Sequence, residues 1–91
     1  MVNLDQLKVG EVDLERLQLY NANLKDVGRV LAEVLEITDK TIFMRYRLDN
    51  AIDDFEGWEY KRLSHNEFRD DVHVIEKVLR YKLIKIEYGE K

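Results

Sequence analysis

The chain has no cysteine and no proline among its 91 residues, and it has only four glycines. Without cysteine, disulfides, thiolate metal sites and thiol nucleophiles are excluded. Average proline usage of about 5% would give roughly four or five prolines in a chain of this length. Their absence predicts regular structure joined by tight turns. The glycines, at positions 10, 28, 57 and 89, are isolated, so no glycine-rich phosphate loop is present.

Signals for export and for membrane insertion are also missing. No stretch approaches the roughly 18 apolar residues of a membrane-spanning helix. The first fifteen residues, MVNLDQLKVGEVDLE, carry acids where a signal peptide needs a basic end and an apolar run. We therefore expect a cytoplasmic protein that does not contact a membrane.

The composition is that of one small folded domain covering residues 1–91. Hydrophobic residues make up 45% and charged residues 37% of the chain, which permits both a core and solubility. The net charge of −4 is unevenly distributed. Residues 49–57 contain four acids and no base, whereas residues 77–91 contain five bases and two acids.

The segment 24–37 has two interpretations. Helical spacing links Leu24, Val27 and Leu31, but Gly28 and several β-branched residues disfavour a helix. The alternating pattern that follows predicts a hairpin with strands at 28–37 and 41–48. We favour the hairpin, with its turn at Asp39 and Lys40, and keep the helix as the alternative.

The second half of the chain begins with a short aromatic strand at 58–63. Ser64 and Glu67 then form a capping-box pattern that starts a helix. This helix either runs to about residue 80 or lasts for a single turn before a strand at 72–75. A final alternating strand is expected at 83–88.

Near the N-terminus, Asn3 and Asp13 resemble the N-caps of two short helices separated by Gly10. With the strands above, the sequence predicts an α+β fold: a small antiparallel β-sheet with one or two short helices. A partly open SH3-like barrel is compatible with the same order of elements.

The residues needed for known catalytic and metal sites are missing or wrongly spaced. In the acidic loop, an EF-hand beginning at Asp49 would need glycine where Asp54 stands and glutamate where Tyr60 stands. His65 and His73 are too far apart along a helix to share one metal easily. Ser64, the only serine, is explained by its capping position. We expect no enzymatic activity, no metal and no cofactor.

Binding is the remaining class of function. A dense acidic block adjoins the single tryptophan, and tryptophan and tyrosine are frequent at interface hot spots. We therefore predict a protein-binding, inhibitor- or adaptor-like module. A second copy of the chain is another candidate partner, through the last strand or an open edge strand. The predicted contact residues are Asp49, Asp53, Asp54, Glu56, Trp58 and Tyr60.

Nucleic-acid binding is the alternative, because cations and aromatic rings alternate on two of the predicted strands. The sequence pI of about 5.2 argues against it, since most nucleic-acid-binding domains are basic. The same cations can instead pair with Glu33, Glu36 and Glu59 across strands. The residues of this alternative are Phe43, Arg45, Arg47, Lys61 and Arg62, together with Trp58 and Tyr60.

Overall fold

The computed structural model describes residues 2–48 and 57–78. In these residues the chain forms eight strands and one short helix. The elements are β1 (Asn3–Leu4), β2 (Gln6–Val9), β3 (Val12–Glu15), β4 (Leu19–Leu24), β5 (Gly28–Thr38), β6 (Thr41–Leu48), β7 (Glu59–Ser64), α1 (His65–Asp71) and β8 (Val72–Val78). The strand predicted at 83–88 lies outside the described residues.

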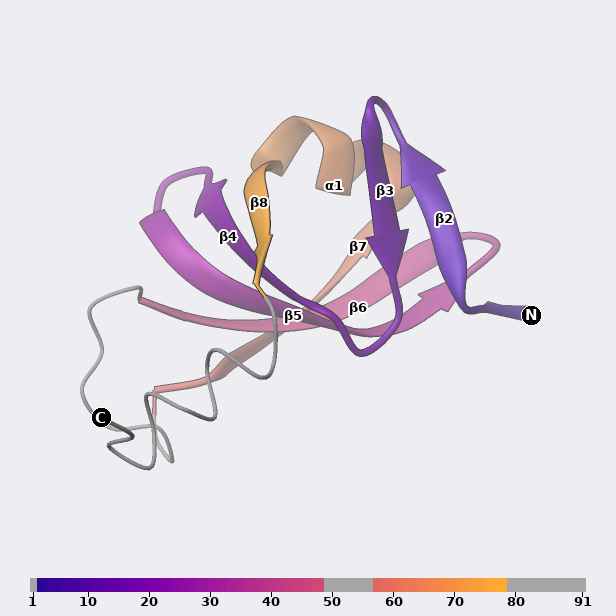
Figure 1. Cartoon of the computed structure of the whole chain (residues 1–91), viewed down its shortest axis with the longest axis horizontal. Coiled ribbons are helices and arrows are strands. Elements are labelled where there is room, and N and C mark those ends of the chain that lie inside the picture. The colour runs from indigo at the N-terminus through magenta and orange to yellow at the C-terminus, as the bar shows by residue number, and fades with distance from the viewer. Residues whose placement is uncertain (1, 49–56, 79–91) are drawn as a thin grey trace.

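The strands form one large sheet and one small one, and all described pairs are antiparallel. The large sheet has the order β7-β6-β5-β4-β8, with β1 beside β5, and β2 and β3 form a separate hairpin. This hairpin and α1 lie on the same side of the curved sheet (Figure 1). The prediction of an antiparallel sheet with a short helix is therefore confirmed.

The predicted hairpin of β5 and β6 is confirmed, and the helical interpretation of 24–37 is wrong. β5 pairs with β4 along one edge and with β6 along the other, so its backbone is committed to the sheet. A β-bulge between Val34 and Glu36 adds Leu35 as an extra residue. Before the bulge, the core residues of β5 are two positions apart, and across the bulge Val34 and Ile37 are three positions apart. A spacing of three also occurs on one face of a helix.

Thr38 closes the turn between these strands. Its hydroxyl oxygen accepts hydrogen bonds from the backbone N–H groups of Lys40, at 3.2 Å, and Thr41, at 2.8 Å. Thr38 is fully buried, so this oxygen satisfies backbone donors where water does not reach. The turn lies at Asp39 and Lys40, as predicted.

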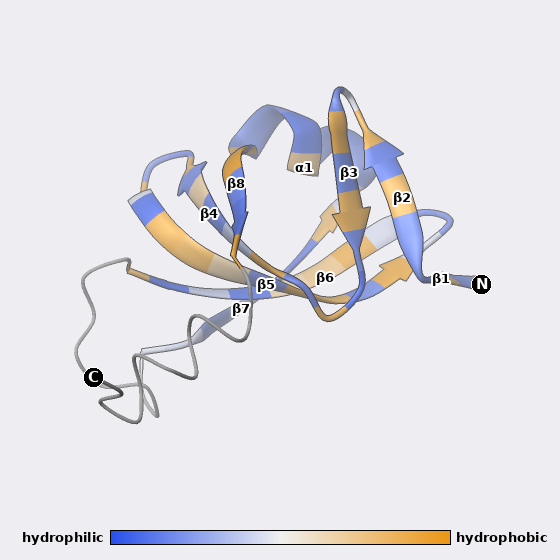
Figure 2. Ribbon diagram, viewed as in Figure 1, coloured by the Kyte–Doolittle hydropathy of each residue, from blue (hydrophilic) through white to orange (hydrophobic). Residues whose placement is uncertain are grey.

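The two N-terminal helices predicted from Asn3 and Asp13 are wrong. Asn3 lies in β1, opposite Thr38, and Asp13 lies in β3, opposite Lys8. Apolar and polar residues alternate along β2 and β3, as Figure 2 shows, which is the period of a strand. Gly10 permits the tight turn between them because its φ is +61°, a conformation that disfavours other residues.

The capping box before α1 is confirmed. The Ser64 side chain accepts from the Glu67 N–H at 3.1 Å, and the Glu67 carboxylate accepts from the Ser64 N–H at 2.8 Å. The helix ends at Asp71, and β8 follows directly and pairs with β4. The long-helix alternative is therefore wrong, and the interpretation as one helical turn followed by a strand is correct.

The core lies between the large sheet and the layer formed by α1 and the β2–β3 hairpin. Its fully buried side chains come from both layers, including Leu14 of the hairpin and Met44 of the sheet. We call the sheet face toward this layer the inner face and the opposite one the outer face. The buried apolar residues of this core are Val9, Leu14, Tyr20, Ala22, Leu24, Val30, Ala32, Val34, Ile37, Ile42, Met44, Leu63, Phe68 and Val72.

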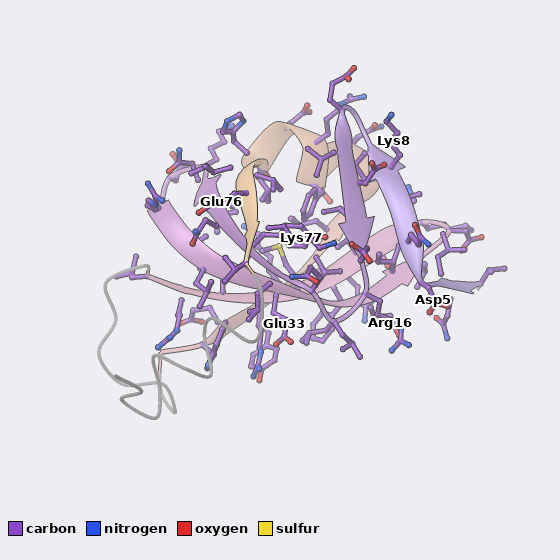
Figure 3. The ribbon with its side chains drawn as sticks, in the orientation of Figure 1. Asp5, Lys8, Arg16, Glu33, Glu76 and Lys77 are labelled. Atoms are coloured by element: carbon purple, nitrogen blue, oxygen red, sulfur yellow. The ribbon has the colours of Figure 1, made fainter. Side chains whose placement is uncertain are left out.

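Polar contacts of side chains also attach the hairpin to the sheet. The Tyr20 hydroxyl accepts from the Glu15 N–H at 2.9 Å and donates to the Asp13 carbonyl at 3.4 Å. Burial raises the pKa of Tyr20, so the hydroxyl keeps the proton that it donates. Lys77 of β8 forms an ion pair with Glu15, while Asp5 and Arg16 pair at the base of the hairpin (Figure 3).

Truncating Leu14 tests whether the hairpin belongs to the cooperative core. Leu14→Ala should lower the free energy of unfolding by about 2–5 kcal/mol, because it leaves a cavity under a fully buried side chain. The matched control is Leu48→Ala, at the last residue of β6 and 52% exposed, which should change stability by no more than about 0.5 kcal/mol. Urea unfolding measures both. Equal effects of the two variants would contradict the packing described.

The capping box predicts a pH dependence. Hydrogen bonds from the Ser64 backbone and side chain lower the pKa of Glu67 below its ordinary value of 4.5. A lowered folded-state pKa gives stability that is present above the unfolded-state pKa and is lost as the pH falls through the folded-state pKa. The stability difference between the wild type and Glu67→Gln should thus be larger at neutral pH than at about pH 3. Urea unfolding at both pH values measures it, and an unchanged difference would contradict this role.

Candidate interaction surface

Aromatic rings and arginines meet on the outer face of the sheet. Residues directly opposite each other in a sheet share a face, and the register places Phe43 opposite Arg62 and Arg45 opposite Tyr60. Their neighbours along β6, Ile42 and Met44, point to the inner face and are fully buried. We call Phe43, Arg45, Trp58, Tyr60 and Arg62 the aromatic–arginine cluster.

The rings and guanidinium groups of the cluster are in direct contact. Phe43 and Tyr60 stack with their ring centroids 6.0 Å apart and their planes 23° apart. The Arg62 guanidinium carbon lies 4.8 Å from the Phe43 centroid, and that of Arg45 lies 4.3 Å from the Trp58 centroid. These are cation–π distances, so each arginine is positioned by a ring as well as by its strand.

Both arginines of the cluster also have carboxylate partners on β5. The Arg45 Nε donates to Glu33 Oε1 at 2.8 Å, and the Glu33 side chain is only 5% exposed. Arg62 pairs with Glu36 at 3.0 Å, in a more exposed position. The expected cross-strand pairing of these cations with Glu33 and Glu36 is thus present. The charge that each arginine can offer a ligand is partly neutralised.

Arg45 carries its charge throughout the pH range of folded proteins. Burial lowers the pKa of Arg45, but hydrogen bonds with Tyr60 and Glu33 and the attraction of Glu33 outweigh this effect and raise the pKa above its ordinary value. Arg45 is therefore a lasting positive charge on the outer face, beside the Glu33 carboxylate. Figure 3 shows Glu33 on the side of the sheet opposite the hairpin.

The cluster differs in how much of each side chain solvent can reach. Tyr60 is 58% exposed, Arg62 is exposed, and Phe43, Arg45 and Trp58 are partly buried. The exposed part of the cluster is therefore a tyrosine ring held against a phenylalanine, with a guanidinium beside it. Arg47, by contrast, is only 8% exposed, and its guanidinium carbon lies 5.3 Å from the Trp58 centroid.

The structure brings together most of the residues predicted for the nucleic-acid alternative. Phe43, Arg45, Tyr60 and Arg62 are cross-strand neighbours, and Trp58 joins them through Arg45. Lys61 lies opposite Met44, on the inner face, and so does not join the cluster. Asp49, Asp53, Asp54 and Glu56 lie outside the described residues.

Two features of the cluster were not evident from the sequence. The burial of Glu33 depends on the central position of β5, and the stack of Phe43 on Tyr60 depends on the register of β7. The tight alternation of Phe43, Arg45 and Arg47 was a usable signal for a shared face. The diagonal pairing of rings between strands had no counterpart in the sequence, because the loop between β6 and β7 does not fix their register.

A hollow lies between the tip of the β2–β3 hairpin, α1 and β8. Its volume is about 230 Å³, and its ionisable lining residues are Glu11, Arg69 and His73. His65 lies elsewhere, where its Nε2 is 2.9 Å from the carbonyl oxygen of Thr38. Within residues 2–48 and 57–78, no group of three or more histidine, aspartate or glutamate side chains is placed to hold a metal ion.

No protein-family model, no curated protein and no solved structure matches this chain. Among the described residues, no helix is long and apolar enough to cross a membrane.

The two ion pairs of the cluster should differ in their contribution to stability. Arg45→Ala removes a partner of the buried Glu33 carboxylate and should cost about 3 kcal/mol, the magnitude for breaking a buried pair. Arg62→Ala breaks an exposed pair and should cost at most about 1 kcal/mol. Urea unfolding of both variants against the wild type measures the difference. A larger loss for Arg62→Ala would contradict the assigned burial.

Proposed function

We propose that this protein is a non-enzymatic binding module that recognises a protein partner through the aromatic–arginine cluster. The observation that carries this proposal is the Tyr60 ring, which is 58% exposed and yet fixed in a stack on Phe43. The proposed surface also includes the acidic residues that precede Trp58 in the chain, Asp49, Asp53, Asp54 and Glu56.

An ordered cluster of this kind suits a binding surface because less freedom is lost when a partner binds. Tyrosine, tryptophan and arginine are the residues most enriched at interface hot spots. In free proteins, ordering a flexible side chain at an interface costs roughly 0.5–1.5 kcal/mol. Here Arg45 and Arg62 already have ring and carboxylate contacts that restrict them. A partner with an apolar centre and a polar rim matches this arrangement.

Single-stranded nucleic acid is the second candidate, because Tyr60 and Phe43 offer rings for base stacking beside two arginines. Two electrostatic features argue against nucleic-acid binding. Glu33 and Glu36 neutralise Arg45 and Arg62 at 2.8 and 3.0 Å, and the chain as a whole carries −4. Phosphate contacts supply much of nucleic-acid affinity, so this pairing favours a protein ligand.

The proposal includes two further points. A partly open SH3-like barrel is the architecture we propose, supported by the curvature of the large sheet and by the hairpin packed against its inner face (Figure 1). The cytoplasm is the compartment that we propose, and the sequence carries no sign of an oxidising one.

Partner capture with purified bait tests the proposed surface. Tyr60→Ala should raise the dissociation constant for a protein partner by about thirtyfold, the effect of removing a 2 kcal/mol hot spot, and so reduce its recovery. Ile75→Ala on β8, at a side chain 42% exposed, is the matched control and should bind normally. Partner capture by the double variant Asp53→Lys, Asp54→Lys tests whether the acidic residues contribute to binding. Full binding by Tyr60→Ala would refute the proposed surface.

Fluorescence of the single tryptophan distinguishes the two ligand classes. Trp58 contacts Arg45 and Arg47, so a ligand bound at the cluster should change its emission. Titration with a single-stranded oligonucleotide should leave the emission unchanged, even at low salt. A salt-sensitive change would instead support the nucleic-acid alternative.

A further inference from the structure

Strand β7 ends the large sheet on one side within the described part of the chain, and it pairs with β6 along its other edge. An edge strand is a template for pairing with another strand. In β7, residues of opposite charge lie on either side of Tyr60, and this arrangement affects such pairing. Glu59 and Lys61 flank Tyr60, and both point to the inner face, opposite Tyr46 and Met44. Glu59 is exposed and Lys61 is half-buried.

A second copy of β7 can pair with this edge across a two-fold axis perpendicular to the sheet. Such an axis keeps inner faces with inner faces, so residues directly opposite each other must come from the same face. Each allowed register is therefore centred on one residue, which lies opposite itself in the other copy. The possible registers can therefore be compared by which residue lies at the centre of each and which residues it places opposite each other.

The charges of β7 favour one of these registers. Centring on Glu59, Lys61 or Arg62 places that charged residue directly opposite itself, and like charges opposite each other are destabilising. Centring on Leu63 extends the pairing into α1, which begins at His65. Centring on Tyr60 places Glu59 opposite Lys61 of the second copy, and Lys61 opposite Glu59 of the second copy.

We propose that the chain forms a two-fold dimer in which β7 pairs antiparallel with β7 of a second copy, in the register centred on Tyr60. Two Glu59–Lys61 ion pairs cover the joint on the inner face, and the two Tyr60 rings adjoin on the outer face. A lysine on an edge strand ordinarily discourages pairing. In this strand, Lys61 disfavours the register in which it lies opposite itself and stabilises the one that places it opposite Glu59.

The dimer goes beyond the proposed function, because it depends on Glu59 and Lys61 of the inner face and needs no other partner. It would join the two large sheets into one and bring two aromatic–arginine clusters together on the same outer face. Pairing of one short strand buries less than about 1,200 Å², the range of weak complexes. We therefore expect a dissociation constant for the dimer of roughly 10–100 μM.

Charge reversal tests the dimer with purified full-length protein in sedimentation equilibrium. Glu59→Lys places lysines opposite each other and Lys61→Glu places glutamates opposite each other, so each should weaken association by about tenfold or more. Combining both changes in one chain restores the opposite-charge pairs and should restore the dimer. An equal mixture of the two single variants should form a heterodimer for the same reason.

The lack of cysteine in the chain allows the register to be measured directly. Cα atoms directly opposite each other in antiparallel strands are about 4.5–5.5 Å apart, within the range of a disulfide. Tyr60→Cys should therefore crosslink under mild oxidation, whereas Lys61→Cys and Arg62→Cys should crosslink much less.

Two results would overturn the dimer. One is a monomeric mass for the wild type at concentrations above the expected range. The other is efficient crosslinking at Lys61→Cys or Arg62→Cys in place of Tyr60→Cys. Circular dichroism of each variant identifies loss of folding, and rescue by the double charge reversal separates an electrostatic effect from a structural one. Full partner capture by Tyr60→Ala, with the charge-reversal results as expected, would refute the proposed function and leave the dimer standing.

Discussion

The β-bulge at Leu35 is the constraint on which both faces of the sheet depend. In a regular strand, Glu33 and Glu36 would point to opposite faces, because they are three positions apart. The extra residue changes the alternation, so both carboxylates lie on the outer face, level with Arg45 and Phe43. The same change returns Ile37 to the inner face, where it is fully buried. One inserted residue thus supplies the core with an isoleucine and the aromatic–arginine cluster with its second carboxylate.

Some parts of the fold were predictable from local patterns, and others were not. The strands β5 and β6 and their turn followed from the alternation after Glu36 and from the polar pair Asp39 and Lys40. The capping box was predictable because it is defined by two residues at a fixed spacing. The helical spacing of Leu24, Val27 and Leu31 joins the end of β4, the turn and the start of β5, so it links residues of two different strands and not one helix face.

The N-terminal prediction failed for a different reason. Asn3 and Asp13 are good helix caps in isolation, but a cap pattern does not decide between a helix and a strand when the flanking residues alternate. The burial of Leu14 and the turn at Gly10 are satisfied by a hairpin laid over the sheet. For the site, the sequence indicated which strands carry rings and cations. It did not indicate that Lys61 lies on the inner face, because this depends on the pairing of β7 with β6.

The β2–β3 hairpin forms its own two-stranded sheet and is attached to the large sheet by side chains, chiefly the core contacts of Leu14 and the hydroxyl of Tyr20. A unit attached in this way can open without breaking the pairing of the large sheet. Amide protons of the hairpin should therefore exchange with solvent through a local opening of lower free energy than global unfolding. Asp5 and Arg16, at the base of the hairpin, would mark the hinge of that motion. Such an opening would leave the backbone pairing of the large sheet in place, and with it the strands that carry the aromatic–arginine cluster.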